Sequence, residues 1–124
     1  MKIRLKGNAL RYRLTRPEVE RIADTGLVEE RVNFGPATLS YALCTTEAVE
    51  LSATFGDNRI TLYLPAAFID EWIHTDKVGF EHRMPLNGTE EHLYLLVEKD
   101  YTCLDNVEED QSDNYPNPLL KKLL

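Results

Sequence analysis

The chain has 124 residues, a formal net charge of −7, 43% hydrophobic residues and 28% charged residues. This length corresponds to one domain, and the hydrophobic fraction excludes a chain that is disordered throughout. An acidic chain is poorly suited to duplex nucleic acid, and no apolar run approaches the roughly 18 residues of a membrane span. We therefore expect neither duplex nucleic acid nor a membrane as a partner.

The charge is distributed unevenly along the chain. Residues 1–16 contain six basic residues and no acidic one, whereas residues 98–113 contain seven acidic residues and one lysine. Such asymmetry is typical of a binding surface, of two chain ends that pair with each other, or of a solvated tail. The sequence leaves these three interpretations open.

Two runs of alternating residues, 2–6 and 9–14, open the chain, and a Gly-Asn pair separates them. Alternation indicates half-buried strands, and a Gly-Asn pair suits a two-residue hairpin turn. The turn places Leu5 opposite Leu10, so the apolar residues of both runs share one face. The basic residues share the other face: Lys2, Arg4, Lys6, Arg11 and Arg13.

Two short helices are predicted. Residues 16–25 follow a capping box formed by Thr15 and Glu18, and Gly26 supplies the C-terminal stop. The segment PAAFIDEWIH opens the second helix with a proline, and Trp72 belongs to its apolar side.

Further alternating segments indicate strands at residues 27–34, 38–44, 51–55, 59–64, 78–81 and 92–98. The strands follow one another as hairpins rather than as βαβ units. We therefore expect an α+β fold with an antiparallel, strongly curved sheet or open barrel of about eight strands and two short helices. Each half has a helix after a hairpin, which indicates a weak pseudo-repeat. Residues 1–104 form the predicted domain, and residues 105–124 form an acidic C-terminal segment and terminal tail.

The basic side of the first hairpin is the candidate functional site. Arg4 opposite Arg11, and Lys2 opposite Arg13, place like charges directly across the ladder, which destabilises a hairpin unless something neutralises them. Either a bound anion, such as a phosphate or carboxylate, or acidic residues from neighbouring strands would do so, and the other alternative is that these side chains fan into water. The anion-binding candidates are Lys2, Arg4, Lys6, Arg11 and Arg13.

Other residues that often carry chemistry give weaker signals. His74, His82 and His92 have no metal-motif spacing and the acidic segment lacks EF-hand spacing, so we expect no metal and no cofactor. Cys44 and Cys103 lie far apart without a CxxC pattern, which favours a reduced, cytoplasmic protein. No phosphate-binding loop or nucleophile motif occurs, so whether the protein is an enzyme stays open. The terminal LLKKLL is compatible with a homo-oligomer contact or a disordered end.

Five blocks carry a resemblance over most of the chain: KIRLKGNALRYRLT (2–15), EVERIADTGLVEE (18–30), WIHTDKVGFEHRMPL (72–86), LLVEKDYTCLD (95–105) and EDQSDNYPNP (109–118). In these blocks the chain resembles a family of small uncharacterised bacterial proteins, of the Bacteroidetes type, whose function is unknown. The resemblance implies a cytoplasmic bacterial protein and no particular activity. It also implies that the acidic segment is more than a dispensable tail.

The run LRYRL (10–14) is similar in style to the triphosphate tunnel enzymes of the CYTH-like fold, whose curved antiparallel sheet turns Arg and Lys inward toward phosphates. That resemblance implies a hydrolase of phosphate esters or triphosphates with Mg²⁺ held by carboxylates. Glu81, Glu98 and Asp100 are the candidates by strand position. Those enzymes carry Glu-x-Glu-x-Lys on the first strand, whereas this chain has Lys-x-Arg-x-Lys, of which only Lys6 matches.

Three functions follow as hypotheses. The first is a small cytoplasmic binding protein whose cationic sheet face takes an anionic, phosphorylated small molecule or an acidic protein surface. The second is the tunnel-type hydrolase. The third is a structural or interaction protein in which the basic hairpin pairs with the acidic segment of the same or another chain.

Overall fold

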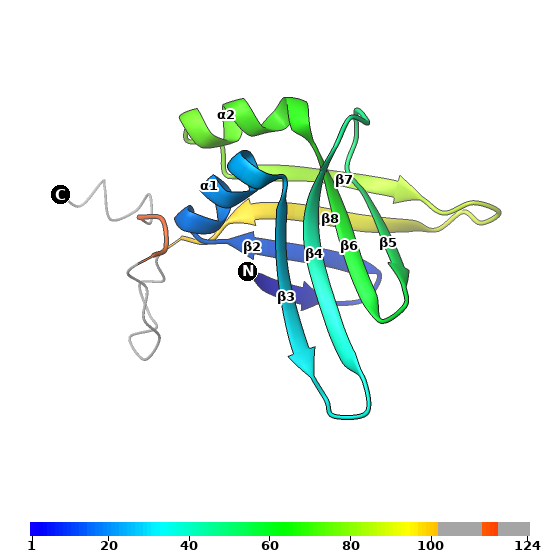
Figure 1. The fold of residues 1–124 in the computed structure, drawn as a ribbon. Helices are drawn as coiled ribbons and strands as arrows, with labels where there is room; N and C mark the ends of the chain where they lie inside the picture. Colours follow the sequence, from blue (N-terminus) through cyan, green and yellow to red (C-terminus); the bar gives the residue numbers. More distant parts are fainter. Residues whose placement is uncertain (102–112, 117–124) are drawn as a thin grey trace.

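The computed structural model describes residues 1–101 and 113–116, and within them the chain forms eight strands, two α-helices and a short 3₁₀ helix. In chain order these are β1 (Lys2–Leu5), β2 (Ala9–Leu14), α1 (Arg16–Thr25), β3 (Leu27–Asn33), β4 (Thr38–Thr46), β5 (Ser52–Gly56), β6 (Arg59–Pro65), η1 (Ala66–Phe68), α2 (Ile69–His74), β7 (Gly79–Pro85) and β8 (His92–Lys99). The strands form two sheets (Figure 1). Sheet A has the order β1-β2-β8-β7, and sheet B has the order β3-β4-β6-β5.

The predicted eight strands and two short helices are confirmed, but the predicted single antiparallel, strongly curved sheet or open barrel is wrong in two respects. Each sheet consists of two antiparallel hairpins joined by a parallel central pair, β2 with β8 and β4 with β6. The sheets are also separate from each other and not closed. Alternation specifies which face a strand buries, and it carries no information about the direction of the neighbouring strand.

The first hairpin has the predicted register: Lys2 pairs with Arg13, Ile3 with Tyr12, Arg4 with Arg11, and Leu5 with Leu10. Its turn contains Gly7 with a φ of 56°. The turn between β5 and β6 uses Asp57 and Asn58 with φ values of 52° and 59°. Two-residue hairpin turns need this left-handed backbone, which Gly, Asn and Asp adopt more readily than other residues.

The two halves of the chain have the same topology. The segments β1-β2-α1-β3-β4 and β5-β6-α2-β7-β8 each contain a hairpin, a helix and a second hairpin. The first hairpin of each half pairs in parallel with the second hairpin of the other half. Backbone hydrogen bonds repeat as well: Thr45 donates to the Gly26 carbonyl at 3.0 Å, and Lys99 donates to the Val78 carbonyl at 2.9 Å. The pseudo-repeat therefore exists at the level of strand pairing.

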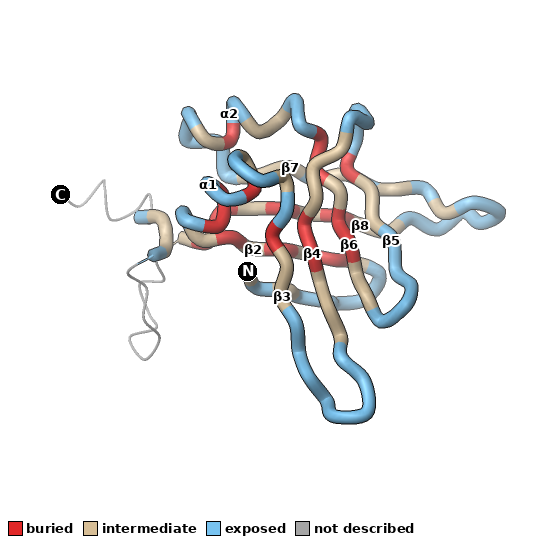
Figure 2. Tube along the Cα trace, in the orientation of Figure 1, coloured by how far each residue is buried: buried red, intermediate tan, exposed pale blue. Residues whose placement is uncertain are grey.

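The core lies between the two sheets and continues under the helices. Figure 2 shows the buried segments concentrated on β2, β8, β4 and β6. The buried apolar side chains of these strands are Leu10, Tyr12, Leu14, Leu43, Leu62, Leu64, Leu95 and Val97. Helix α1 adds Val19 and Ile22, and α2 adds the fully buried Trp72, which confirms its predicted place in the core. The helices lie at one end of the sheets and close that end of the core (Figure 1).

The hairpin tips at the other end expose apolar surface. A groove of about 410 Å³ there is lined by apolar side chains from both sheets, among them Leu10, Ile60 and Leu93. Leu5 and Phe55, at equivalent places in the two hairpins, line the same groove and are 65% and 76% exposed. The helices therefore cover one end of the space between the sheets, and its other end borders solvent.

Helix α1 begins at the predicted capping box. The Thr15 backbone N–H donates to Glu18 Oε1 at 2.9 Å, and Gly26 ends the helix with a φ of 77°. The carboxylate of Glu18 also forms an ion pair with the Met1 ammonium, which in turn lies 3.0 Å from Glu30 Oε1. A single buried carboxylate thus connects the start of β1 to the first turn of α1.

We expect the Glu18→Gln variant to show a weaker dependence of stability on acid pH. Burial raises the pKa of Glu18, but hydrogen bonds from the Met1 ammonium and Thr15 outweigh it and lower that pKa below its usual value. A carboxyl group of this kind stabilises the fold above its unfolded-state pKa, and this contribution is lost as pH falls through the folded-state pKa.

The melting temperatures of wild type and Glu18→Gln should therefore differ at about pH 6 and converge as pH falls through the lowered pKa of Glu18, below which the residue is neutral in both proteins. A difference that stays constant across this range would contradict the assigned role of Glu18.

Candidate functional site

The outward side of sheet A carries the candidate residues, and we call it the basic face. Successive side chains of a strand point to opposite faces, so the residues between the core positions of β1, β2, β7 and β8 point outward. The basic face consists of Lys2, Arg4, Lys6, Arg11, Arg13, Glu81, Arg83, Tyr94, Leu96 and Glu98. Strand pairing therefore brings all five predicted residues onto one surface and adds Arg83.

The strand register arranges this face in rows. The rows run Lys6, Ala9, Tyr94, Arg83; then Arg4, Arg11, Leu96, Glu81; then Lys2, Arg13, Glu98, Gly79. Both like-charged pairs expected from the hairpin are present. Strand β8 places an apolar side chain beside one pair and a carboxylate beside the other.

Glu98 neutralises two guanidinium groups. Its Oε1 atom accepts hydrogen bonds from Arg11 Nε at 2.7 Å and from Arg13 Nε at 2.6 Å. Arg11 Nη2 lies 2.6 Å from the same oxygen. Hydrogen bonds between ionised groups are the strong ones, so this single carboxylate oxygen offsets much of the repulsion across the hairpin.

Asp100, directly after β8, neutralises Lys2. Lys2 Nζ lies 3.0 Å from Asp100 Oδ2, although the direction of approach leaves this buried oxygen without a well-aligned hydrogen bond. Glu98 and Asp100 both belong to residues 98–113, the stretch in which the sequence concentrates seven acidic residues. Acidic residues near the end of the chain therefore neutralise part of the basic N-terminal hairpin, which is one of the alternatives that the sequence left open.

Three other bases of the face have no carboxylate partner within the described residues. Arg4, Lys6 and Arg83 are exposed and form no ion pair there. The remaining carboxylate of the face, Glu81, accepts a hydrogen bond from the Tyr94 hydroxyl. That hydrogen bond, together with burial and the charge of Glu81, raises the pKa of Tyr94. Arg4, Lys6 and Arg83 are therefore the cations of the basic face that remain available to an external anion.

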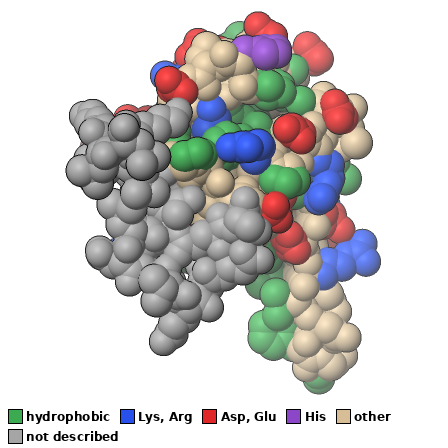
Figure 3. Space-filling model, turned by 90° about the vertical axis from the view of Figure 1, so that its left-hand side faces the viewer, with side chains coloured by type: hydrophobic (Ala, Val, Ile, Leu, Met, Phe, Trp, Pro, Cys, Tyr) green, Lys and Arg blue, Asp and Glu red, His purple; other side chains and the backbone are tan. Residues whose placement is uncertain are grey.

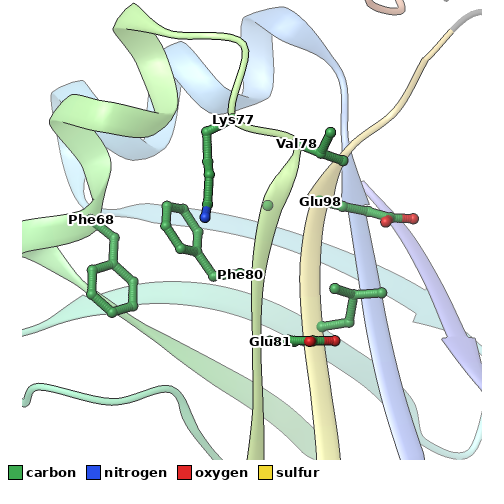
Figure 4. A pocket seen from close by; sticks show the side chains of 8 residues that line it. Phe68, Lys77, Val78, Phe80, Glu81 and Glu98 are labelled. Atoms are coloured by element: carbon green, nitrogen blue, oxygen red, sulfur yellow. The ribbon is translucent and has the colours of Figure 1, made fainter.

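A pocket of about 400 Å³ borders the basic face at the β7 edge (Figure 4). Glu81 and Glu98 extend to one side of β7, whereas Phe68 and Phe80 lie on the other side. The rings of Phe68 and Phe80 stack with centroids 4.6 Å apart, and Lys77 Nζ lies 5.4 Å from the Phe80 centroid. The pocket therefore combines carboxylates from the basic face with aromatic rings that lead to the core.

The tunnel implied by the weaker resemblance requires charged side chains in the interior of the barrel. Here the space between the sheets is filled by apolar side chains, and Arg11 and Arg13 alternate with the buried Leu10, Tyr12 and Leu14. Arg11 and Arg13, which a tunnel enzyme would turn inward toward phosphate, therefore lie on the outer surface. Among residues 1–101 and 113–116, no group of three or more His, Cys, Asp or Glu side chains is placed to hold a metal ion.

The histidines and cysteines are dispersed. His82 lies opposite Leu95 and binds Glu50 at 3.2 Å, so it does not meet His92 across β7 and β8. Cys44 is partly buried on β4. Cys103 and the predicted boundary at residues 104 and 105 lie outside the described residues.

Sequence reasoning missed two basic residues, Arg83 and Lys99. Strand β7 was predicted to end near residue 81, but it continues to Pro85, which places Arg83 in phase with Glu81. Lys99 stands between two acidic residues, which suggests an exposed position. It also continues the alternation of the buried positions of β8, and that signal would have predicted an inward-pointing side chain. Extending each alternating run by one or two residues would have found both.

These observations define a small α+β protein with two mixed sheets and a basic outer sheet face. The chain belongs to a family of unknown function (DUF7009), whose model matches residues 1–119. No curated protein and no solved structure matches it. The expected membership of an uncharacterised family is thus confirmed, and a bacterial origin and the likeness to triphosphate tunnel enzymes stay predictions. In the part of the chain that the structure describes, no helix has the length and apolar character to cross a bilayer.

Proposed function

We propose that the basic face binds an extended anion, such as a polyphosphate chain or the phosphate groups of a phosphorylated small molecule. The observation that supports this most directly is the row Lys6, Ala9, Tyr94, Arg83. It has a cation at each edge of sheet A, and neither cation forms an ion pair within the described residues.

The spacing of the row favours a chain of charges over a single ion. Neighbouring strands lie about 4.8 Å apart, so the backbones of Lys6 and Arg83, three strand spacings apart, are separated by about 14 Å. One inorganic phosphate would contact both side chains only if each leaned toward the middle of the row, whereas a chain of several phosphate groups can contact both where they stand on the sheet. The small side chain of Ala9 leaves room for such a ligand to cross β2.

The charge of the face is opposite to that of the whole protein. Six basic residues surround two outward-facing carboxylates, one of which already holds Arg11 and Arg13. A local surplus of cations attracts anions even when the net charge of a protein is negative. The proposal retains the expectations of a cytoplasmic bacterial protein without a cofactor.

The proposal is tested with a variant that lacks the three available cations, Arg4→Ala/Lys6→Ala/Arg83→Ala. Calorimetric titration of wild type with tripolyphosphate should give an affinity about tenfold higher than with inorganic phosphate. The variant should lose about tenfold of the tripolyphosphate affinity, which corresponds to roughly 1.4 kcal/mol. Because these side chains are exposed and form no ion pair with any residue that the structure describes, the fold should stay intact.

A matched control removes three bases elsewhere, Arg21→Ala/Arg31→Ala/Lys77→Ala. Arg31 is the counterpart of Arg83 in the other half, since both lie two residues after the outward Glu of their strand, on β3 and β7. The control changes the net charge by the same amount but keeps all six bases of the basic face. Its affinity for tripolyphosphate should therefore match that of wild type. Equal affinities for wild type and the basic-face variant, or an equal loss in the control, would overturn the proposal.

We expect Glu98→Gln to increase the affinity for tripolyphosphate by about threefold or more, because the change frees two guanidinium groups and removes one negative charge. The same change should lower the free energy of unfolding by about 1 kcal/mol, since Arg11 and Arg13 exchange a charged shared acceptor for a neutral amide oxygen. Titration calorimetry and urea unfolding measure the two effects. Unchanged or weaker tripolyphosphate binding by a folded Glu98→Gln protein would be inconsistent with an anion site on this face.

The ion pairs of Lys2, Arg11 and Arg13 support a second candidate, a structural role in which the basic hairpin is neutralised by acidic residues of the same chain. Salt screens such pairs, since the Debye length shrinks from about 10 Å at 0.1 M to about 3 Å at 1 M. A structural role therefore predicts a melting temperature that falls as NaCl rises over this range. A salt-independent melting temperature would count against it.

A further inference from the structure

The last residue of β8, Lys99, points into the molecule. It continues the inward alternation of Leu95 and Val97, and the residue is only 4% exposed. Its Nζ donates a hydrogen bond to the Thr75 carbonyl at the end of α2, at 2.9 Å. Within the described residues no carboxylate forms an ion pair with it. A buried ammonium group whose hydrogen-bond acceptor is a neutral carbonyl lacks a counter-charge, which is an unfavourable arrangement.

A pocket of about 400 Å³ lies beside this ammonium group, at the end of the molecule where the helices lie. Its walls come from the start of α1, the end of α2, the end of β8 and residues 115–116. The lining residues that matter here are Arg16, Ile73, Asp76, Lys99, Tyr101 and Tyr115. Figure 3, which views the molecule from this side, shows Lys and Arg side chains next to hydrophobic ones.

Tyr115 lies against both cations of the pocket. Lys99 Nζ is 5.0 Å, and the Arg16 guanidinium carbon 5.4 Å, from the centroid of its ring. The ring also contacts Tyr101, with centroids 5.8 Å apart, and the Tyr115 backbone N–H donates to the Asp100 carbonyl at 2.8 Å. Burial raises the pKa of Tyr115 to about 12, so its hydroxyl is neutral at physiological pH and supplies no counter-charge.

We propose that this pocket binds a small organic oxyanion, a carboxylate or a phosphate monoester with an aromatic or apolar body, between Arg16 and Lys99. The exposed Arg16 guanidinium forms no ion pair within the described residues, and its planar fork suits two oxygens of one such group. Lys99 supplies a second cationic donor from the end of β8. The pocket is larger than an inorganic ion requires, and Ile73 and Tyr101 offer contacts to an apolar body.

The electrostatics of the pocket agree with this assignment. Burial lowers the pKa of Lys99, and the charge of Asp76 opposes that effect only in part. A bound oxyanion would supply a counter-charge in direct contact with the ammonium group, whereas Asp76 acts on it without forming an ion pair. Asp76 also lines the pocket, which favours an anion of low charge over a polyphosphate and so separates this site from the basic face.

A purely structural role for Lys99, as the residue that caps the C-terminus of α2, accounts for the hydrogen bond to Thr75 but makes no use of Arg16. The test therefore depends on Arg16→Gln, which changes an exposed residue and should leave the fold intact. Benzoate and phenyl phosphate serve as probes, one for each source of the oxyanion. Binding is followed on the full chain by amide chemical shifts in NMR titrations.

We expect at least one of the two probes to bind saturably to wild type, with shifts at residues 75 and 101, and to lose about tenfold in affinity in Arg16→Gln. Lys99→Arg should retain more affinity than Lys99→Gln. The basic-face variant Arg4→Ala/Lys6→Ala/Arg83→Ala should bind the probe as wild type does, which keeps this test independent of the proposed function. Absence of saturable binding with both probes, or equal affinities for wild type and Arg16→Gln, would overturn the inference.

Discussion

Replacement of Trp72 by alanine is expected to lower the free energy of unfolding by about 3–5 kcal/mol, the usual loss for a large buried aromatic side chain. Trp72 is fully buried where α2 closes the end of the core. Its indole N–H donates to the Val78 carbonyl at 3.0 Å, and its ring meets the edge of Phe80 at a centroid distance of 6.1 Å. The alanine variant loses the volume, the hydrogen bond and the aromatic contact together.

Urea unfolding followed by circular dichroism measures this loss, because the chain has a single tryptophan and fluorescence cannot follow the variant. Trp72→Phe is the matched control, since it keeps most of the apolar volume and loses the indole N–H. We expect it to lose about 1–2 kcal/mol, from the smaller ring and the lost indole hydrogen bond, while the Val78 carbonyl keeps the Lys99 N–H as a donor. A loss below about 1 kcal/mol for Trp72→Ala would show that α2 does not close the core as described.

Replacement of Gly79 by alanine is the second change with a large expected effect, about 3 kcal/mol of folding stability. A Cβ atom at this position would lie 2.0 Å from the Val97 carbonyl oxygen and 2.7 Å from Glu98 Cα. Both are backbone atoms of β8, so the clash can be relieved only if β7 moves away from its partner. The variant should therefore weaken the pairing that holds Arg83 on the basic face.

The matched control is Gly56→Ala on the edge strand β5. No heavy atom lies within 4 Å of a Cβ built there, and its φ is not in the left-handed region. We expect Gly56→Ala to change stability by less than about 1 kcal/mol, in either direction. Thermal unfolding measures the loss of stability in each variant. Equal losses in Gly79→Ala and Gly56→Ala would show that the close approach of Gly79 to β8 does not contribute to stability.

The elements that depend on neighbouring residues were predictable, and the first hairpin shows why. Alternation fixed which residues share a face, and the Gly-Asn turn fixed which residues oppose each other, so Arg4 was expected opposite Arg11 and is found there. Helix α1 was equally local, because Thr15, Glu18 and Gly26 specify its ends. Patterns within about ten residues therefore gave the correct local structure.

The parallel pairing of β2 with β8 was not predictable in the same way. It joins residues from opposite ends of the chain, and the apolar alternation of β8 would suit a parallel or an antiparallel neighbour equally well. The neutralisation of Arg11 and Arg13 by Glu98 depends on that pairing. The sequence could therefore present acidic neighbours only as one of two alternatives.

The strand order also has a consequence for how the protein folds. All four strands of sheet B come from one continuous stretch, residues 27–65, whereas sheet A joins residues 2–14 to residues 79–99. Contacts between distant parts of a chain form more slowly, because a long loop must close first, and an isolated two-stranded hairpin is marginally stable. During synthesis, sheet B can thus assemble while the first hairpin is still without its partner strand β8. The cations of that hairpin obtain Glu98 only when β8 emerges, so the basic face is completed after all four strands of sheet B have been synthesised.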